Sequence, residues 1–406
     1  YYLLPNGLFG WASGMDHVES ACENSLNGIF AVTTDSGTRN FESQQKCTSE
    51  HEYYHLLQYA YNYRQSSWVL ESTARNSEFH VWPEHANPWG VWQWMTHPYY
   101  SLWDGSDFHK YAPHFWIYLE AHYGRDFMTR IWKRSCHQNV FDALFEEVAE
   151  LGADLDDILA DFALWNYFTG ERDDGRHYDP AYSIPAVYHQ VAYWDYPVLP
   201  TSLPADKTAQ PGGSNYVRFF GPAEATDLKV SFAGHPDMID QRAVIVLAVS
   251  EWGHESWRLE PGADGTGSVT VPDWGLYDYA TLVVSNFWEA PRDSALLAYS
   301  YAAEEVDQAP GPADAARLTG SFPNPFREST RVFFYTPRDG APTTIRVYDL
   351  SGRLVRTLVD ETMHNGMHQI AWDGRDAGGR SASAGIYLVR MDSGGHRHSG
   401  KLMLLK

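Results

Sequence analysis

Hydrophobic positions follow a helical period in the first part of the chain. Between about residues 40 and 170, apolar side chains recur at i, i+3, i+4 and i+7, which places them on one face of a helix. Two such sets are Phe141, Leu144, Phe145 and Val148, and then Leu155, Ile158, Leu159 and Phe162. The pattern predicts a helix-rich globular domain over residues 1–186, with a small sheet near its start.

The pattern changes near residue 187. Short runs rich in β-branched and aromatic residues then recur at short intervals, separated by Gly, Pro and Asp clusters. This arrangement predicts a β-sandwich accessory domain over residues 187–303. Residues 304–316 are rich in Pro, Ala and acidic residues and predict a linker. Residues 317–406 again alternate polar and apolar positions, so the expected fold is multidomain, α+β followed by all-β.

The net charge of the chain limits the classes of partner that it can bind. The 406 residues include 52 acidic and 30 basic side chains, which gives a net charge of −22. So acidic a chain is unsuited to binding the phosphates of nucleic acids. No apolar run approaches the roughly 20 residues that a membrane-spanning helix needs. We therefore expect no nucleic-acid partner and no membrane span.

The chain has three cysteines, Cys22, Cys47 and Cys136. An odd and low number does not indicate a disulfide scaffold. Two interpretations stay open. Cys22 and Cys47 form a disulfide in an oxidising compartment, or all three cysteines are buried thiols.

The clearest chemical signal is the segment HEYYH at residues 51–55. On a helix His51 and His55 are one turn apart, so both imidazoles can bind one ion. Glu52 is rotated about 100° from His51 and can take a proton from water at that ion without binding it. This is the HExxH arrangement of zinc peptidases. The alternative is a histidine pair that is exposed or satisfied in the core.

A zinc site that keeps one position for water needs a third ligand. A metzincin would have Gly at position 58 and His at 61, but the chain has Gln58 and Tyr61. The next candidate is Glu71, on a second helix that starts near Trp68 and runs back along the first. The alternative ligands are Glu78, His80 and His85. Glu78 is also a candidate partner for a histidine ligand.

Four segments resemble a family of secreted bacterial zinc metalloproteases of the thermolysin-like gluzincin clan. They are HEYYHLLQYAYN, WVLESTA, residues 111–124 and residues 162–172. The resemblance covers about residues 15–300 and is specific around 48–74 and 111–124. It implies that His51, His55 and Glu71 bind Zn²⁺, with Glu52 as general base. The implied activity is a secreted or cell-surface metalloendopeptidase that hydrolyses protein or peptide substrates with a zinc-activated water.

The chain departs from that family at two positions. The residue after the Glu ligand is usually Gly, and here it is Ser72. Thermolysin has an Asp one turn after its Glu ligand that orients a ligand histidine, and here that position is Arg75. The group that orients the histidine must therefore come from elsewhere.

A peptidase also needs a hydrogen-bond donor for the oxyanion of the tetrahedral intermediate. The resemblance favours Tyr111, at the start of a predicted helix where related families often have a tyrosine. Tyr118 and His114 are alternatives, and each of the three could instead be a core or surface residue.

The C-terminal segments are similar to the Ig-like domain of the flagellar hook-capping protein family. They include FPNPF at 322–326, residues 345–358, residues 372–380 and residues 384–390. The similarity implies an Ig-like β-sandwich in an exported protein, with secretion or cell-surface machinery as a partner. It also makes the Cys22–Cys47 disulfide more credible.

Two other function classes compete with the peptidase. One is a non-catalytic extracellular adhesion or assembly protein built on a gluzincin scaffold, for which self-assembly is expected. The other is carbohydrate recognition by the middle β-sandwich.

Overall fold

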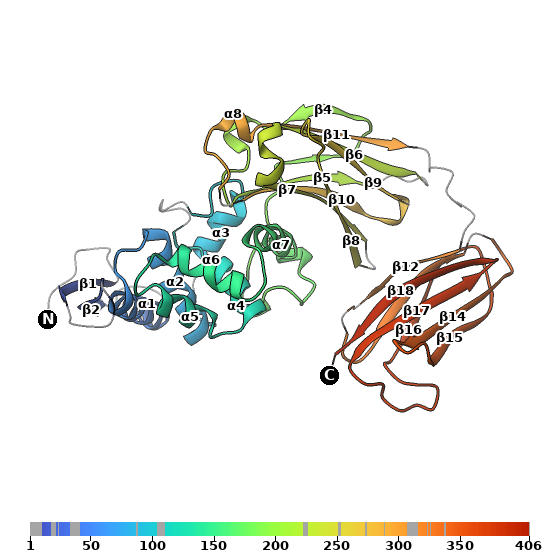
Figure 1. Ribbon diagram of the computed structural model, residues 1–406, viewed down its shortest axis with the longest axis horizontal. Coiled ribbons are helices and arrows are strands. Elements are labelled where there is room, and N and C mark those ends of the chain that lie inside the picture. The colour runs from blue at the N-terminus through green and yellow to red at the C-terminus, as the bar shows by residue number, and fades with distance from the viewer. Residues whose placement is uncertain are drawn as a thin grey trace.

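The computed structural model describes residues 10–17, 22, 24–32, 41–86, 88–103, 110–221, 226–250, 253–272, 274–287, 289–306, 316–322, 324, 326–336 and 338–405. Its first part is a hairpin of two antiparallel strands followed by helices (Figure 1). The strands are β1 (Gly10–His17) and β2 (Leu26–Val32), and both contact α1. The helices are α1 (Phe41–Tyr61), α2 (Ser67–Val81), α3 (Trp89–Thr96), α4 (His114–Tyr123), α5 (Phe127–Arg134), α6 (Val140–Glu150) and α7 (Leu155–Tyr167).

Several of these helices begin at a side chain that accepts a hydrogen bond from the first turn. Ser66 accepts from the backbone N–H of Val69 at the start of α2, and Asp154 accepts from that of Asp156 at the start of α7. Such caps satisfy backbone donors that have no partner within the helix. The apolar faces meet in one core that includes Trp68, Trp94, Trp116, Phe115 and Leu144.

The middle of the chain is a β-sandwich, as its pattern predicts. One sheet has the order β3 (Val191–Tyr193), β5 (Ser214–Phe220), β10 (Tyr279–Asn286), β7 (Arg242–Ser250), β8 (Gly253–Leu259). The other has the order β4 (Val198–Ser202), β11 (Tyr299–Val306), β6 (Asp227–Gly234), β9 (Thr266–Val271). Strand β11 continues to Val306, beyond the predicted start of the linker at residue 304, and residues 307–315 lie outside the described residues.

Alternation along the strands divides the side chains of the five-stranded sheet between two cores. In β5, Val217 and Phe219 face the core between the two sheets, whereas Tyr216 belongs to the core of the helices. Tyr216 Oη donates a hydrogen bond of 2.8 Å to the carbonyl of Ala163 in α7. The helical domain therefore packs on the outer face of this sheet (Figure 1).

Short helical segments connect these elements. They are η1 (Gly170–Arg172), η2 (Pro180–Tyr182), η3 (Ala205–Lys207), η4 (Pro236–Gln241), η5 (Trp274–Leu276) and α8 (Ser294–Leu297). Among the described helices, none combines the length with the apolar composition that crossing a bilayer would require.

The C-terminal part is a second β-sandwich. Its three-stranded sheet has the order β12 (Arg317–Phe322), β13 (Thr330–Thr336), β16 (Gly366–Trp372). Its four-stranded sheet has the order β15 (Leu354–Met363), β14 (Ala341–Asp349), β17 (Gly385–Ser393), β18 (His396–Leu404). Inward-facing residues of both sheets, among them Val332, Phe334, Ile345, Val347 and Trp372, form the core.

The hypothesis of a Cys22–Cys47 disulfide is wrong, because Cys22 is bonded to Cys136 and Cys47 is a buried free thiol. The backbone N–H of Tyr63 donates to the carbonyl of Asn24, which holds the Cys22 segment at the C-terminal end of α1. Cys47 lies about 22 Å away along that helix, at 1.5 Å per residue. A bond that closes a loop of 114 residues removes enough chain entropy from the unfolded state to stabilise the fold by about 5 kcal/mol.

Candidate metal centre

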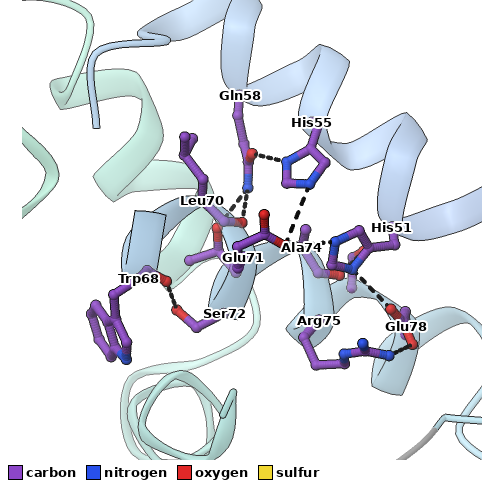
Figure 2. Close-up of polar contacts among 12 residues, drawn as sticks. His51, His55, Gln58, Trp68, Leu70, Glu71, Ser72, Ala74, Arg75 and Glu78 are labelled. Carbon is purple, nitrogen blue, oxygen red and sulfur yellow. Dashed lines mark hydrogen bonds and ion pairs between the residues drawn. The ribbon is translucent and has the colours of Figure 1, made fainter. Parts of the chain in front are cut away.

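Helices α1 and α2 form an antiparallel pair because the turn between them is anchored from outside. The side-chain amide of Asn62 donates to the carbonyls of Ser135 (2.8 Å) and Gln138 (3.0 Å). Ser66 then starts α2, which runs back along α1. This arrangement brings Glu71 of α2 opposite His51 and His55 of α1 (Figure 2).

Three side chains converge with the separations that one zinc ion needs. His51 Nε2 lies 3.1 Å from Glu71 Oε2, and His55 Nε2 lies 3.8 Å from the same oxygen. One ligand atom from each residue lies within 4.8 Å of the others. In a tetrahedral zinc site with bonds of about 2.0–2.1 Å, ligand atoms are about 3.4 Å apart. The set His51, His55 and Glu71 therefore fits Zn²⁺ in both chemistry and spacing.

The imidazole of His51 is oriented by Glu78. Its Nδ1 lies 2.9 Å from Glu78 Oε1, while Glu78 Oε2 accepts from Arg75 Nη1 at 2.7 Å. With Nδ1 donating to a carboxylate that is only 1% exposed, Nε2 is left to face Glu71. Burial acts to lower the pKa of His51, but the contacts with Glu71 and Glu78 outweigh it and raise the pKa. The two carboxylates thus favour positive charge at His51.

The imidazole of His55 is oriented by Gln58. In the sequence, Gln58 indicated only that the chain is not a metzincin. The amide nitrogen of Gln58 donates to the carbonyl of Leu70 and to Thr73 Oγ1, both at 2.8 Å. Its oxygen therefore faces His55, at 2.7 Å from Nδ1. Because that oxygen only accepts, Nδ1 carries the proton and Nε2 has its lone pair free for a metal. The signal in the sequence was the i, i+3 spacing of His55 and Gln58.

The two departures from the family pattern have a structural explanation. Ser72 Oγ donates to the carbonyl of Trp68 and accepts from Trp116 Nε1 at 2.7 Å, which fastens α2 to α4. Arg75 stands where thermolysin has an orienting Asp, and it binds Glu78 one turn further along α2. Glu78 is thus the orienting carboxylate, supplied from a later turn of the same helix.

Two carboxyl groups at the site have opposite pKa shifts. Burial raises the pKa of Glu52 to about 7, and the charges of Glu71 and Glu78 add to the effect. For Glu71, burial acts to raise the pKa, but His51, His55 and Lys110 outweigh it and the pKa is lowered. Glu71 is therefore ionised near neutral pH, whereas the carboxylate of Glu52 binds a proton more strongly than an ordinary glutamate.

The alternative ligands lie elsewhere. His80 Nε2 contacts the buried carboxylate of Glu120 on α4, and His85 Nε2 lies 3.7 Å from Glu84. Neither histidine belongs to the convergent group in the described part of the chain. Glu78 reaches Nδ1 of His51 and not the face where Glu71 and His55 meet.

Of the three candidate oxyanion donors, Tyr111 is the one whose ring lies beside a histidine of the group. Its ring centre is 6.4 Å from that of His51. Tyr118 is buried and donates to Asp161 at 2.8 Å, and His114 is fully buried against Trp94. Tyr111 lies in the turn before α4 and not in the helix itself.

Close packing holds the Tyr111 backbone in place. A Cβ on Gly90 of α3 would lie 2.2 Å from the carbonyl oxygen of Tyr111, so only glycine permits this approach. Burial raises the pKa of Tyr111, and the charge of Glu71 raises it further. The phenol therefore stays protonated and can donate a hydrogen bond.

Replacing Glu78 tests how far the orienting carboxylate supports metal binding. We expect Glu78→Gln to weaken zinc binding by about 10- to 100-fold, because His51 loses the charged acceptor at Nδ1. Zinc affinity is measured by competition with a chromophoric chelator, and circular dichroism monitors the fold. Glu84→Gln, at a mostly exposed carboxylate of the same region, is the matched control. Equal affinity of the two variants would contradict the assigned role of Glu78.

Comparison with known proteins identifies one part of the chain. Residues 326–395 match the family model described as the FlgD Ig-like domain. The C-terminal β-sandwich is therefore Ig-like, as its segments predicted. None of the curated protein sequences matches the chain.

Solved structures give only distant similarities. Dimeric latent PorU from Porphyromonas gingivalis is 17% identical over 52% of this chain and 20% of its own, with a TM-score of 0.23. A GH2 β-galacturonidase from Eisenbergiella tayi is 12% identical over 47% and 34%, with a TM-score of 0.19. PorZ, a surface component of the type-IX secretion system of P. gingivalis, is 13% identical over 39% and 22%, with a TM-score of 0.18. The chain thus spans about a fifth to a third of these proteins.

Proposed function

We propose that the chain is a zinc-dependent metalloendopeptidase of the gluzincin type. The proposal depends on one observation. The side chains of His51, His55 and Glu71 converge, and both histidines present Nε2 to a common point. Separate hydrogen bonds from the two Nδ1 atoms to Glu78 and Gln58 orient the two rings, as is usual for metal-binding histidines. Two histidines that happened to lie near each other on a surface would not need Glu78 or Gln58 to fix the orientation of their rings.

In this proposal His51, His55 and Glu71 hold the metal from two neighbouring helices. Bound zinc would polarise the scissile carbonyl and lower the pKa of a water molecule at the open position. Glu52 follows His51 directly in α1 and would take the proton of the attacking water. A pKa near 7 suits a group that accepts this proton and then donates it to the leaving amine.

Tyr111 would donate a hydrogen bond to the oxyanion that forms at the scissile carbonyl. Two cations lie near the ring of Tyr111 and would favour the negative charge of that oxyanion. Arg75 Cζ is 5.5 Å and Lys110 Nζ 4.9 Å from the centre of the ring. We expect Tyr111→Phe to lower kcat by about 10²- to 10³-fold while zinc stays bound. Turnover and zinc content are measured together, with Tyr63→Phe as a control. Unchanged turnover would remove Tyr111 from the mechanism.

We also place the protein outside the cytoplasm, secreted or at the cell surface. The Cys22–Cys136 disulfide supports this location, because such bonds persist in oxidising compartments. The Ig-like domain at residues 326–395 supports it further and would be the part that meets secretion or surface machinery.

The whole proposal is tested on the full chain by zinc analysis and a peptide library. We expect about one zinc per chain, and cleavage that a chelator abolishes and added zinc restores. A zinc-loaded chain that cleaves no member of the library would instead favour the adhesion or assembly protein.

A further inference from the structure

A group of two arginines and a histidine lies where the helical domain meets the middle β-sandwich. Arg172 ends η1 just after α7, Arg218 lies in β5, and His189 belongs to the segment that joins the two domains. The guanidinium carbons of the two arginines lie 4.6 and 5.9 Å from the centre of the Tyr167 ring. Arg218 also lies over Tyr279, at 4.3 Å. Both guanidinium groups thus gather around one buried tyrosine.

Among the described residues, the hydrogen-bond acceptors of these arginines are all neutral. Arg172 donates to the backbone carbonyls of Tyr167 (2.8 Å) and Val187 (3.1 Å). Arg218 Nη2 lies 2.9 Å from both Tyr167 Oη and His189 Nε2. Within the described residues neither guanidinium pairs with a carboxylate, and Nε of Arg218 is buried with no acceptor. Two positive charges therefore remain without a counter-charge in this part of the structure.

Burial and the positive charges of the two arginines change the pKa values of neighbouring groups. Burial lowers the pKa of His189 to about 2, and the charges of Arg218 and Arg172 contribute to the shift. Burial also lowers the pKa of Arg172, together with the like charge of Arg218. The chain as a whole carries −22, so this positive region is not a consequence of its composition. Partly buried like charges without a partner destabilise a fold unless an ion of opposite charge binds them.

We propose that Arg172 and Arg218 form a binding site for a small oxyanion, either a carboxylate or a phosphate or sulfate group. The planar fork of a guanidinium matches two oxygens of such a group, and the hydrogen bonds are charge-assisted. As whole residues both arginines are partly exposed, although Nε of Arg218 is buried, so an anion would approach the terminal nitrogens of the two guanidinium groups. This site is separate from the proposed peptidase centre and does not depend on it.

Because one arginine comes from each domain, a bound oxyanion would tie the two domains together. Other contacts already join them there, including the hydrogen bond of 2.9 Å from Thr281 Oγ1 to Tyr167 Oη. The anion therefore strengthens a junction that exists without it, and it stabilises the folded chain in proportion to its occupancy. For the same reason we expect single substitutions of Arg172 or Arg218 to fold.

The test is isothermal titration calorimetry on the full chain with sodium sulfate, phosphate and acetate at constant ionic strength, followed by thermal unfolding. We expect saturable binding of at least one of the three, and a rise in Tm that saturates with it. Arg218→Met and Arg172→Met should each weaken binding at least tenfold. Arg258→Met in β8 is the matched control, because that guanidinium is already paired with Asp157 and Glu260, each at 3.0 Å.

The outcomes separate a built site from a general salt effect. Binding of acetate alone would identify a carboxylate ligand, and binding of sulfate and phosphate alone a tetrahedral one. No saturable heat with any of the three for the unmodified chain overturns the proposal. Binding by Arg218→Met and Arg172→Met that is as tight as that of the unmodified chain also overturns it, as does a Tm that rises without saturation in every variant. Zinc content and peptide cleavage should be unchanged in Arg218→Met, so the result is independent of the peptidase assignment.

Discussion

Glu52→Gln is expected to abolish peptide cleavage while the chain keeps its zinc and its fold. The amide has nearly the same shape as the carboxyl group but cannot accept a proton from water. Loss of a general base alone costs about 10²- to 10⁴-fold in rate. Glu52 is 8% exposed and its pKa is raised by burial, so a neutral amide should be accommodated without loss of stability. Initial rates on a peptide identified from the library, zinc content and circular dichroism are the three measurements.

Glu50→Gln is the control for this experiment. Glu50 lies in the same helix, and burial raises its pKa as well, but its partner is Ser77 and not the metal group. We expect Glu50→Gln to cleave the peptide at a rate within about twofold of that of the unmodified chain, because substitutions away from a functional site usually have small effects. Cleavage by Glu52→Gln within tenfold of the unmodified rate would be incompatible with the mechanism.

Glu71→Gln should remove the metal itself. The carboxylate is the charged member of the group and contacts both Nε2 atoms, at 3.1 and 3.8 Å. Losing a ligand should weaken zinc binding by more than the roughly 100-fold that the loss of a supporting residue causes. Zinc per chain after dialysis against a chelator is the measurement, and peptide cleavage should disappear with the metal.

The comparison with Glu78→Gln makes this prediction specific. Both variants lose one negative charge beside His51, but only Glu71 faces the point where the two Nε2 atoms meet. Zinc loss should therefore be clearly greater for Glu71→Gln. One full equivalent of zinc retained by Glu71→Gln would exclude Glu71 as the third ligand.

Features that depend on residues close in sequence could be predicted from the chain alone. The i, i+4 spacing of His51 and His55 places both on one face of α1, and Glu52 is adjacent to them by necessity. The strand alternation that indicated the middle sandwich is also local, because successive side chains of a strand point to opposite faces. The motifs of the C-terminal region likewise predicted its Ig-like domain.

Contacts between distant segments were decided only by the tertiary structure. The disulfide joins Cys22 to Cys136 because the segment before β2 packs at the far end of α1, which no count of cysteines reveals. The roles of Gln58 and Glu78 depend on the rotation of α2 against α1. The meeting of Arg172 with Arg218 depends on how the sandwich docks on α7. A sequence determines which side chains share one element, whereas packing between elements, through many weak contacts, selects the side chains that meet across them.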